Sequence, residues 1–258
     1  GSFEQLRAVA VAAAGMHAQW WARTSHDIGT SWIPAKQGLD YANFVGGFIK
    51  SEPEWYKEIW TALQRYFEAV PVTLVHGDCR LGNMMFPTLP GIARSEKPAE
   101  AAEGVPPVVF SDWEATNVGP ALWDLAYLCT LSQGAKERRE RQSALLSAYL
   151  AALGSGMPGQ VTPVSPAEGL EQLELLQLVL FYVSASVTKN RLWSGHGNTT
   201  KDGMAWAMRV AQAVIDLTGS ATACAKLAAA LQLPTHFFRN LCTLCQEGLD
   251  AAKAVGAD

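Results

Sequence analysis

Two short apolar runs, each leading into acidic residues, interrupt a chain whose other patterns are helical. The runs are "VTLVHGD", residues 72–78, and "PVVFSDW", residues 107–113. Both are rich in the β-branched and aromatic residues that favour strands. We expect two neighbouring strands here, whose ends would gather four polar side chains in one small volume: Asp78, Asn83, Asp112 and Glu114.

The segment between the two runs is of a different kind. Residues 87–107, "PTLPGIARSEKPAEAAEGVPP", are rich in Pro, Gly, Glu and Ala and carry no periodic apolar face. We expect them to form the extended connection of a small β-hairpin. This hairpin would be an insert in a helical body and would carry the polar site.

Helical patterns account for the rest of the chain. An Ala-rich helix is expected over residues 3–24, and a second helix at Ser51, where "SEPE" combines a Ser cap with Glu three residues later. An irregular aromatic connection would join them. From Ala121 the pattern is helical almost to the end, with a second capping box at residues 165–168 and Pro at the first helical position. The last helices are expected at 166–192, 201–218, 222–231 and 235–255. The fold class is therefore α+β and predominantly α-helical.

Composition and charge argue against several classes of protein. The net charge is −4 and is spread along the chain, so no basic face for nucleic acid is expected. The longest strongly apolar run, residues 175–187, is shorter than the roughly twenty residues of a membrane span, which predicts a buried core helix. Five cysteines without framework spacing favour free thiols and an intracellular, reducing compartment. The CxxC of Cys242 and Cys245 lies in a helical pattern and is interpreted as core thiols.

The gathered acids indicate a particular chemistry. Clustered carboxylates repel one another unless a cation or hydrogen-bond donors compensate their charge. Oxygen ligands of this kind suit Mg²⁺, which is usually held by one or two carboxylates together with substrate phosphates. A carboxylate outside the metal shell could accept the proton of an attacking hydroxyl. This combination is what phosphoryl transfer requires.

The same residues resemble a known superfamily. "HGDxxxxN" at residues 76–83, followed by "DWE", "GP" and "DLAY", resembles the aminoglycoside phosphotransferase and choline-kinase-like superfamily, which shares the protein-kinase fold. The variant "HGDxRLxN" with "DWE" is similar to the kinase-like domains associated with acyl-CoA dehydrogenases and to related small-molecule kinases. Two motifs in agreeing order and context make this signal specific.

The resemblance implies a role for each matching residue. Asp78 would be the catalytic base, and Asn83 and Asp112 would be the magnesium ligands and would bind the cofactor. Arg80 and Glu114 are further cofactor-binding candidates, expected to contact phosphate or substrate.

Three more residues are implied as structural support. His76 would brace the catalytic loop, Gly77 would allow its tight turn, and Asp124 would accept hydrogen bonds from loop amides. His17, His26, His196 and His236 are expected to have structural roles only. The loop at residues 191–203, with Arg191, Trp193 and His196, is either a substrate contact or an ordinary interhelical connection.

The resemblance also implies a domain organisation. Residues 1–258 would form a single kinase-like C-terminal lobe, with leading helices at 3–70, the catalytic and metal-binding segment at 71–128 and a helical substrate-side part at 129–258. "LRAVAVAAAGMHAQWW" resembles the helix that follows the hinge of these kinases, and neither a glycine-rich loop nor a strand lysine precedes it. The N-terminal nucleotide lobe is thus expected to be absent, and Mg²⁺ and ATP to bind only if that lobe or a protein partner supplies the rest.

Two functions follow as alternatives. The first is an ATP-dependent kinase lobe that phosphorylates a small-molecule hydroxyl, with a hydroxyacyl or other apolar hydroxyl compound favoured as substrate, and that is incomplete as this chain. The second is a kinase-derived, non-catalytic interaction or assembly subunit.

Overall fold

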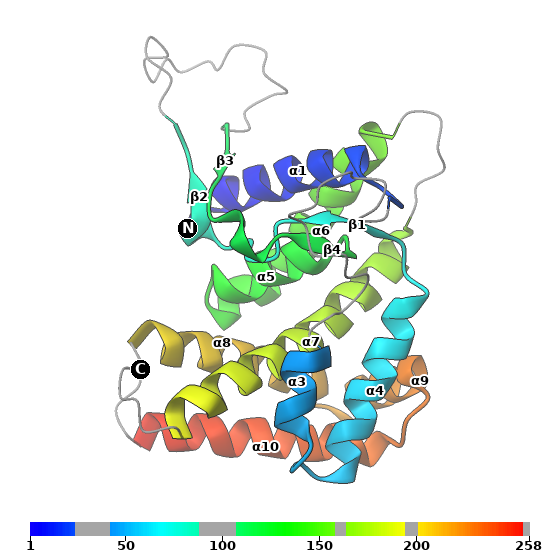
Figure 1. Ribbon diagram of the computed structural model, residues 1–258, viewed down its shortest axis with the longest axis vertical. Coiled ribbons are helices and arrows are strands. Elements are labelled where there is room, and N and C mark those ends of the chain that lie inside the picture. The colour runs from blue at the N-terminus through cyan, green and yellow to red at the C-terminus, as the bar shows by residue number, and fades with distance from the viewer. Residues whose placement is uncertain (24–41, 88–106, 158–163, 194–200, 255–258) are drawn as a thin grey trace. The chain divides into compact units, whose positions relative to one another are not determined.

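The computed structural model describes residues 1–23, 42–87, 107–157, 164–193 and 201–254, and it is mostly helical with few strands (Figure 1). This agrees with the predicted fold class and with a kinase-like C-terminal lobe. The chain divides into two compact units. The first comprises residues 1–36 and 71–170, and the second comprises residues 37–70 and 171–258.

Three helices form the body of the first unit: α1 (Phe3–Gln19), α5 (Trp123–Leu131) and α6 (Ala135–Ser155). α1 lies alongside α6 (Figure 1) and also contacts α5. Its buried face is mainly alanine, and such small side chains let helices pack closely. Ser2 and Gln5 form a capping box at its start, with Ser2 Oγ accepting the Gln5 N–H at 3.2 Å.

The expected end of the first helix is wrong. α1 stops at Gln19 instead of residue 24, and the Trp20 N–H bonds back to the His17 carbonyl. Ala22 then has a positive φ of 56° and donates its N–H to Val72 O at 2.8 Å. The chain leaves the helix because it turns to meet the first strand.

Two small antiparallel sheets belong to the same unit. β1 (Val72–Val75) pairs with β4 (Asn117–Pro120), and β2 (Met84–Met85) pairs with β3 (Val109–Phe110). The two predicted runs therefore do not pair with each other: β1 pairs with β4, and the strands on either side of the expected hairpin connection are β2 and β3. A short 3₁₀ turn follows each run: η1 (Leu81–Asn83) separates β1 from β2, and η3 (Trp113–Ala115) separates β3 from β4. The strand before one turn pairs with the strand after the other.

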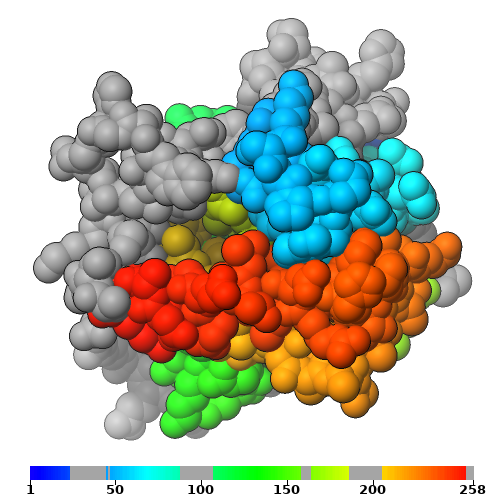
Figure 2. All heavy atoms as spheres, turned by 90° about the horizontal axis from the view of Figure 1, so that it is seen from below, coloured from blue at the N-terminus to red at the C-terminus, as the bar shows by residue number. Residues whose placement is uncertain are grey.

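The second unit consists of helices: α3 (Ala42–Ile49), α4 (Glu54–Glu68), most of α7 (Pro166–Trp193), α8 (Lys201–Thr218), α9 (Ala221–Leu231) and α10 (Thr235–Ala254). α10 packs on α8, α9 and α4, and Figure 2 shows it along one face with α4 beside it. Tyr182 is central to the core, with its ring centroid 4.5 Å from that of Tyr56 and 5.3 Å from that of Trp60.

Two predictions about α7 are confirmed. The apolar run at 175–187 belongs to a helix in which every leucine and valine from Leu173 to Val183 is buried. The capping box is present, because Ser165 N donates to Glu168 Oε2 at 2.9 Å and Glu168 N donates to Ser165 Oγ at 3.3 Å.

The segment before α4 differs from expectation. α4 begins at Glu54 rather than at Ser51, and its N-cap is Pro53, which offers no side-chain hydrogen bond. The region expected to be irregular contains α3, an additional helix with high mean hydropathy. Its sequence, "ANFVGGFI", hides the helix because two glycines interrupt the apolar pattern.

Among the described helices, none has by itself the length and hydropathy of a membrane-spanning segment. One pair, Ala205–Thr218 with Ala221–Leu231, reaches them together by length and composition, with a bend of 93° between its helices.

Candidate functional site

The candidate site begins at the turn after β1. Gly77 has a φ of +87°, and a Cβ at this position would lie 2.1 Å from the backbone oxygen of Ala115. Only glycine fits such a conformation at such close approach. Trp123 Nε1 donates to Gly77 O at 3.0 Å, so the turn is held between η3 and the start of α5.

Asp78, Arg80 and Asn83 form a hydrogen-bonded group beyond this turn. Asn83 Nδ2 donates to Asp78 Oδ2 at 2.8 Å and to the Asp78 backbone oxygen at 3.0 Å. Arg80 Nε lies 3.2 Å from both carboxylate oxygens of Asp78. The Asp78 side chain is 22% exposed and that of Arg80 is 45% exposed, so this ion pair is partly open to water and weak.

Ser111 joins this loop to the second acidic stretch. Its N–H and its Oγ both donate to Asn83 O, at 2.9 and 2.8 Å. His76 Nε2 in turn lies 2.8 Å from Ser111 O. The next residue, Asp112, is therefore brought to the loop through backbone contacts. The sequence interpretation missed Ser111, whose only signal was its place immediately before Asp112.

His76 is locked among aromatic rings. It is fully buried, with its ring centroid 4.8 Å from that of Trp113 and 5.7 Å from that of Phe110. Its Nδ1 accepts the Asp78 N–H at 3.3 Å, while its Nε2 faces a carbonyl. The neutral tautomer with hydrogen on Nε2 satisfies both contacts. His76 thus links the Asp78 backbone to Ser111, the residue directly after β3.

Asp124 lies beneath the turn. Its Oδ2 accepts the His76 N–H at 2.8 Å and its Oδ1 accepts the Gly77 N–H at 3.0 Å. His17 Nε2 lies 3.1 Å from the same Oδ2, and Tyr149 Oη lies 2.8 Å from His17 Nδ1. His17 was expected to have only a structural role, and Tyr149 gave no signal, because their partners are more than a hundred residues away.

Asp112 is held in an unusual conformation. Its φ and ψ are 65° and 63°, in the left-handed region that non-glycine residues rarely adopt. Its carboxylate and that of Glu114 are exposed and make no hydrogen bond or ion pair with any described residue. A strained acidic residue with an unengaged carboxylate is a feature typical of functional sites.

The oxygen atoms on offer suit a hard cation. Among the described residues, the Asn83 side chain makes its hydrogen bonds through Nδ2, which leaves Oδ1 as an acceptor. Asp112 adds a carboxylate that makes no hydrogen bond within the same part of the chain. Within the described residues, no three His, Cys, Asp or Glu side chains gather as a metal site. One amide and one carboxylate are instead the kind of partial shell that Mg²⁺ completes with phosphates and water.

Cys79 follows Asp78 but is not suited to nucleophilic chemistry. The thiol is fully buried, and its burial raises its pKa well above the ordinary value, with the charges of Asp124 and Asp78 adding to the effect. The reactive thiolate is therefore disfavoured. All five cysteines are free thiols.

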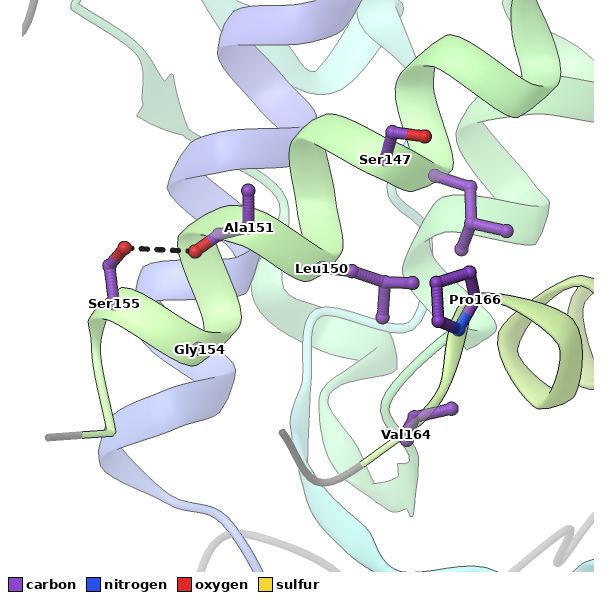
Figure 3. A pocket seen from close by; sticks show the side chains of 8 residues that line it. Ser147, Leu150, Ala151, Gly154, Ser155, Val164 and Pro166 are labelled. Carbon is purple, nitrogen blue, oxygen red and sulfur yellow. Dashed lines mark hydrogen bonds between the residues drawn. The ribbon is translucent and has the colours of Figure 1, made fainter. Parts of the chain in front are cut away.

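A shallow groove of about 500 Å³ lies elsewhere in the first unit, between α6 and the start of α7 (Figure 3). Leu146, Leu150, Val164 and Pro166 give it an apolar lining. Ser155 Oγ, at its edge, donates to Ala151 O at 2.9 Å. The groove includes none of the predicted site residues. The candidate substrate loop at 191–203 lies largely outside the described residues.

Comparison with known proteins points to one family. Residues 52–157, less than half of the chain, match the ecdysteroid kinase-like family, which is part of the protein-kinase-like and choline-kinase-like superfamily. The match includes the loop from His76 to Asn83, Asp112 and Asp124. It supports a kinase-like transferase character for this segment. No curated protein and no solved structure matches the chain.

Proposed function

We propose that the protein is an ATP-dependent phosphotransferase that acts on a hydroxyl group of a small molecule. The observation that carries this proposal is the hydrogen-bonded pair of Asp78 and Asn83, joined through Ser111 to Asp112. A partly exposed carboxylate, an amide oxygen and an exposed carboxylate at one loop cluster are the groups that phosphoryl transfer uses. The family match over the same segment supports the class of reaction.

Asp78 is assigned as the base. Its carboxylate is oriented by Asn83 and remains partly exposed, so an acceptor hydroxyl can reach it. The acceptor oxygen bonds to the terminal phosphorus of ATP, the bond from that phosphorus to ADP breaks, and the hydroxyl proton passes to Asp78. Asn83 Oδ1 and Asp112 would hold Mg²⁺, which supplies charge neutralisation at the phosphates when bound.

Arg80 and Glu114 are assigned to the surroundings of the phosphates. Arg80 is half exposed and bonds Asp78 through Nε, so its terminal nitrogens can donate to a ligand. A guanidinium in this place can bind a phosphate oxygen or an anionic part of the acceptor. Glu114 is exposed on η3, two residues after Asp112, and can contact the acceptor or a metal-bound water.

The acceptor class that we favour is a hydroxyl on an apolar molecule. The matched family is described as ecdysteroid kinase-like, and this description names a steroid as the molecule that is phosphorylated. The "HGDxRLxN" and "DWE" variant favours the same class of apolar alcohol, including hydroxyacyl compounds.

The test is phosphate transfer by the longest natural polypeptide that contains this sequence. Wild type and Asp78→Asn are incubated with Mg²⁺, γ-labelled ATP and a panel of steroid, hydroxyacyl and polar alcohols. We expect transfer to an apolar alcohol and a fall in kcat of about a thousandfold or more in Asp78→Asn. Asp250→Asn is the matched control, because Asp250 is an exposed acid on α10 that accepts a hydrogen bond from Gln246 of the same helix, and it should retain full activity.

One observation favours the alternative of a non-catalytic subunit. Arg80 bonds both oxygens of Asp78, so the assigned base is engaged in this structure. An active enzyme must release this pair, whereas a binding subunit need not. Absence of transfer to every alcohol, together with unchanged nucleotide binding in Asp78→Asn, would decide for the non-catalytic alternative.

A further inference from the structure

A buried chain of hydrogen bonds leads from α6 to the backbone ahead of Asp78. Tyr149 on α6 bonds His17 on α1, His17 bonds Asp124 on α5, and Asp124 bonds the amides of His76 and Gly77. The side chains of Tyr149, His17 and Asp124 are all inaccessible to solvent. Every proton in this chain must therefore be placed on a protein acceptor.

The Tyr149 hydroxyl determines which atom donates in each of these hydrogen bonds. Its contact with His17 Nδ1 at 2.8 Å is its one hydrogen bond in the described part of the protein. A buried hydroxyl that donated to nothing would carry a large desolvation penalty. The Tyr149 O–H therefore donates to Nδ1, and Nδ1 must be the unprotonated nitrogen of His17.

This places the single ring hydrogen of His17 on Nε2. The Nε2–H then donates to Asp124 Oδ2 across 3.1 Å. In the opposite tautomer, a nitrogen lone pair would face a carboxylate oxygen at this distance, and Tyr149 Oη would face an N–H with its own proton left unbonded. The tautomer that Tyr149 selects is thus the one that binds Asp124.

Asp124 needs this third donor. Its carboxylate is buried in the first turn of α5, where the helix N-terminus stabilises negative charge. Oδ1 accepts from Gly77, and Oδ2 accepts from both His76 and His17. A rotation of the carboxylate away from this geometry would release the His76 and Gly77 amides, which lie directly before Asp78.

We propose that Tyr149 is a positioning residue: its hydroxyl selects the Nε2–H tautomer of His17, and through Asp124 this holds the backbone at His76 and Gly77. This proposal rests on the proposed function in one respect only, which is that the loop from His76 to Asn83 is taken to be the catalytic loop. The hydrogen-bond chain itself can be measured whether or not the protein transfers phosphate.

The first measurement is the tautomer of His17 in the present chain. Long-range ¹H–¹⁵N spectra of ¹⁵N-histidine-labelled protein distinguish the two tautomers and the imidazolium, and His17→Gln assigns the His17 signals by their loss. We expect wild-type His17 to be entirely in the Nε2–H form. An Nδ1–H or doubly protonated His17 in the wild type overturns the proposal without any further variant.

The second measurement uses Tyr149→Phe, which removes the hydroxyl and keeps the ring. We expect its His17 signals to show a mixture of forms, and the amides of His76 and Gly77 to exchange about fivefold faster relative to α1 amides. Tyr182→Phe is the matched control, because it removes another fully buried hydroxyl, which donates to Tyr56 O in the second unit. It should leave His17 and both loop amides unchanged.

A conservative variant separates positioning from packing. In His17→Gln, the amide nitrogen can replace Nε2–H as the donor to Asp124, and there is no tautomer to select. Adding Tyr149→Phe to His17→Gln should then not accelerate exchange at His76 and Gly77. The proposal is overturned if Tyr149→Phe changes neither the tautomer of His17 nor the exchange of the two loop amides. It is also overturned if Tyr149→Phe accelerates this exchange equally in the wild-type and the His17→Gln background. A lack of phosphotransferase activity would overturn only the proposed function.

Discussion

The backbone conformation of Gly77 sets the geometry of the candidate site. The positive φ of +87° turns the chain so that its amide reaches Asp124 and its carbonyl reaches Trp123. The same turn brings Gly77 against the backbone of Ala115, just after the acidic stretch. A single glycine thus connects the loop of Asp78 with η3.

We predict that Gly77→Ala lowers the free energy of unfolding by about 3 kcal/mol, because it adds left-handed strain and a collision with the Ala115 oxygen. Gly15→Ala is the control, since a Cβ at Gly15 in α1 meets nothing within 4 Å. It should stabilise the protein by about 0.5–1 kcal/mol. Urea unfolding measures both, and similar effects of the two substitutions would contradict this account.

At the scale of elements, helix starts are set by local chemistry where a cap exists. Ser165 and Glu168 exchange hydrogen bonds at the start of α7, as their spacing predicts. These hydrogen bonds from Ser165 lower the pKa of Glu168. α4 has a similar sequence signal at Ser51 but begins three residues later, at Glu54, with Pro53 as its N-cap, because "SEPE" places Pro directly before the first turn rather than within it.

Replacing Ser165 by Ala should destabilise the protein by about 1 kcal/mol at neutral pH. Because hydrogen bonds from Ser165 lower the pKa of Glu168, only the share of the cap that involves the Glu168 carboxylate depends on pH: it is present above the ordinary glutamate pKa and is lost as pH falls through the lowered one. Thermal unfolding of wild type and Ser165→Ala at pH 7 and pH 3 measures it. Ser51→Ala is the matched control and should have no comparable effect, since α4 has no side-chain cap.

At the scale of the whole molecule, the buried thiols make stability depend on alkaline pH. Burial raises the pKa of Cys129 to about 12, and burial also raises the pKa of Cys79 and Tyr149 well above their ordinary values. Below pH 9 these groups are neutral in both the folded and the unfolded chain. Above pH 9 the unfolded thiols ionise and the folded ones do not, so stability falls with rising pH.

Between pH 8 and pH 10 the free energy of unfolding should fall in both proteins. We expect the fall in Cys129→Ala to be smaller than that in wild type by about 1.4 kcal/mol. The difference arises because one raised thiol pKa has been removed. Urea unfolding at pH 6, 8 and 10 measures it, and the pH 6 to pH 8 interval serves as the control, in which the two proteins should change alike. Parallel pH dependences up to pH 10 would show that Cys129 is accessible to solvent.

Much of the helical organisation could be predicted from sequence, and so could the grouping of the polar residues between His76 and Asn83 on one loop. α8 and α10 follow the expected periodicity to within a residue, and the loop from His76 to Asn83 is held by contacts within itself. The pairing of strands was not predictable in the same way. By composition, β3 is as suitable a partner for β1 as β4 is. That β1 pairs with β4 depends on how η1 and η3 turn the chain.

The sequence by itself determined the features that neighbouring residues settle: helical periodicity, the cap at Ser165 and the order of polar groups between His76 and Asn83. Only the tertiary structure decided which distant side chains complete the site. His17 and Tyr149 are 132 residues apart and meet because α1 packs along α6. Burial then forces their polar atoms to pair, since no water can satisfy them there, and this requirement cannot be read from either segment alone.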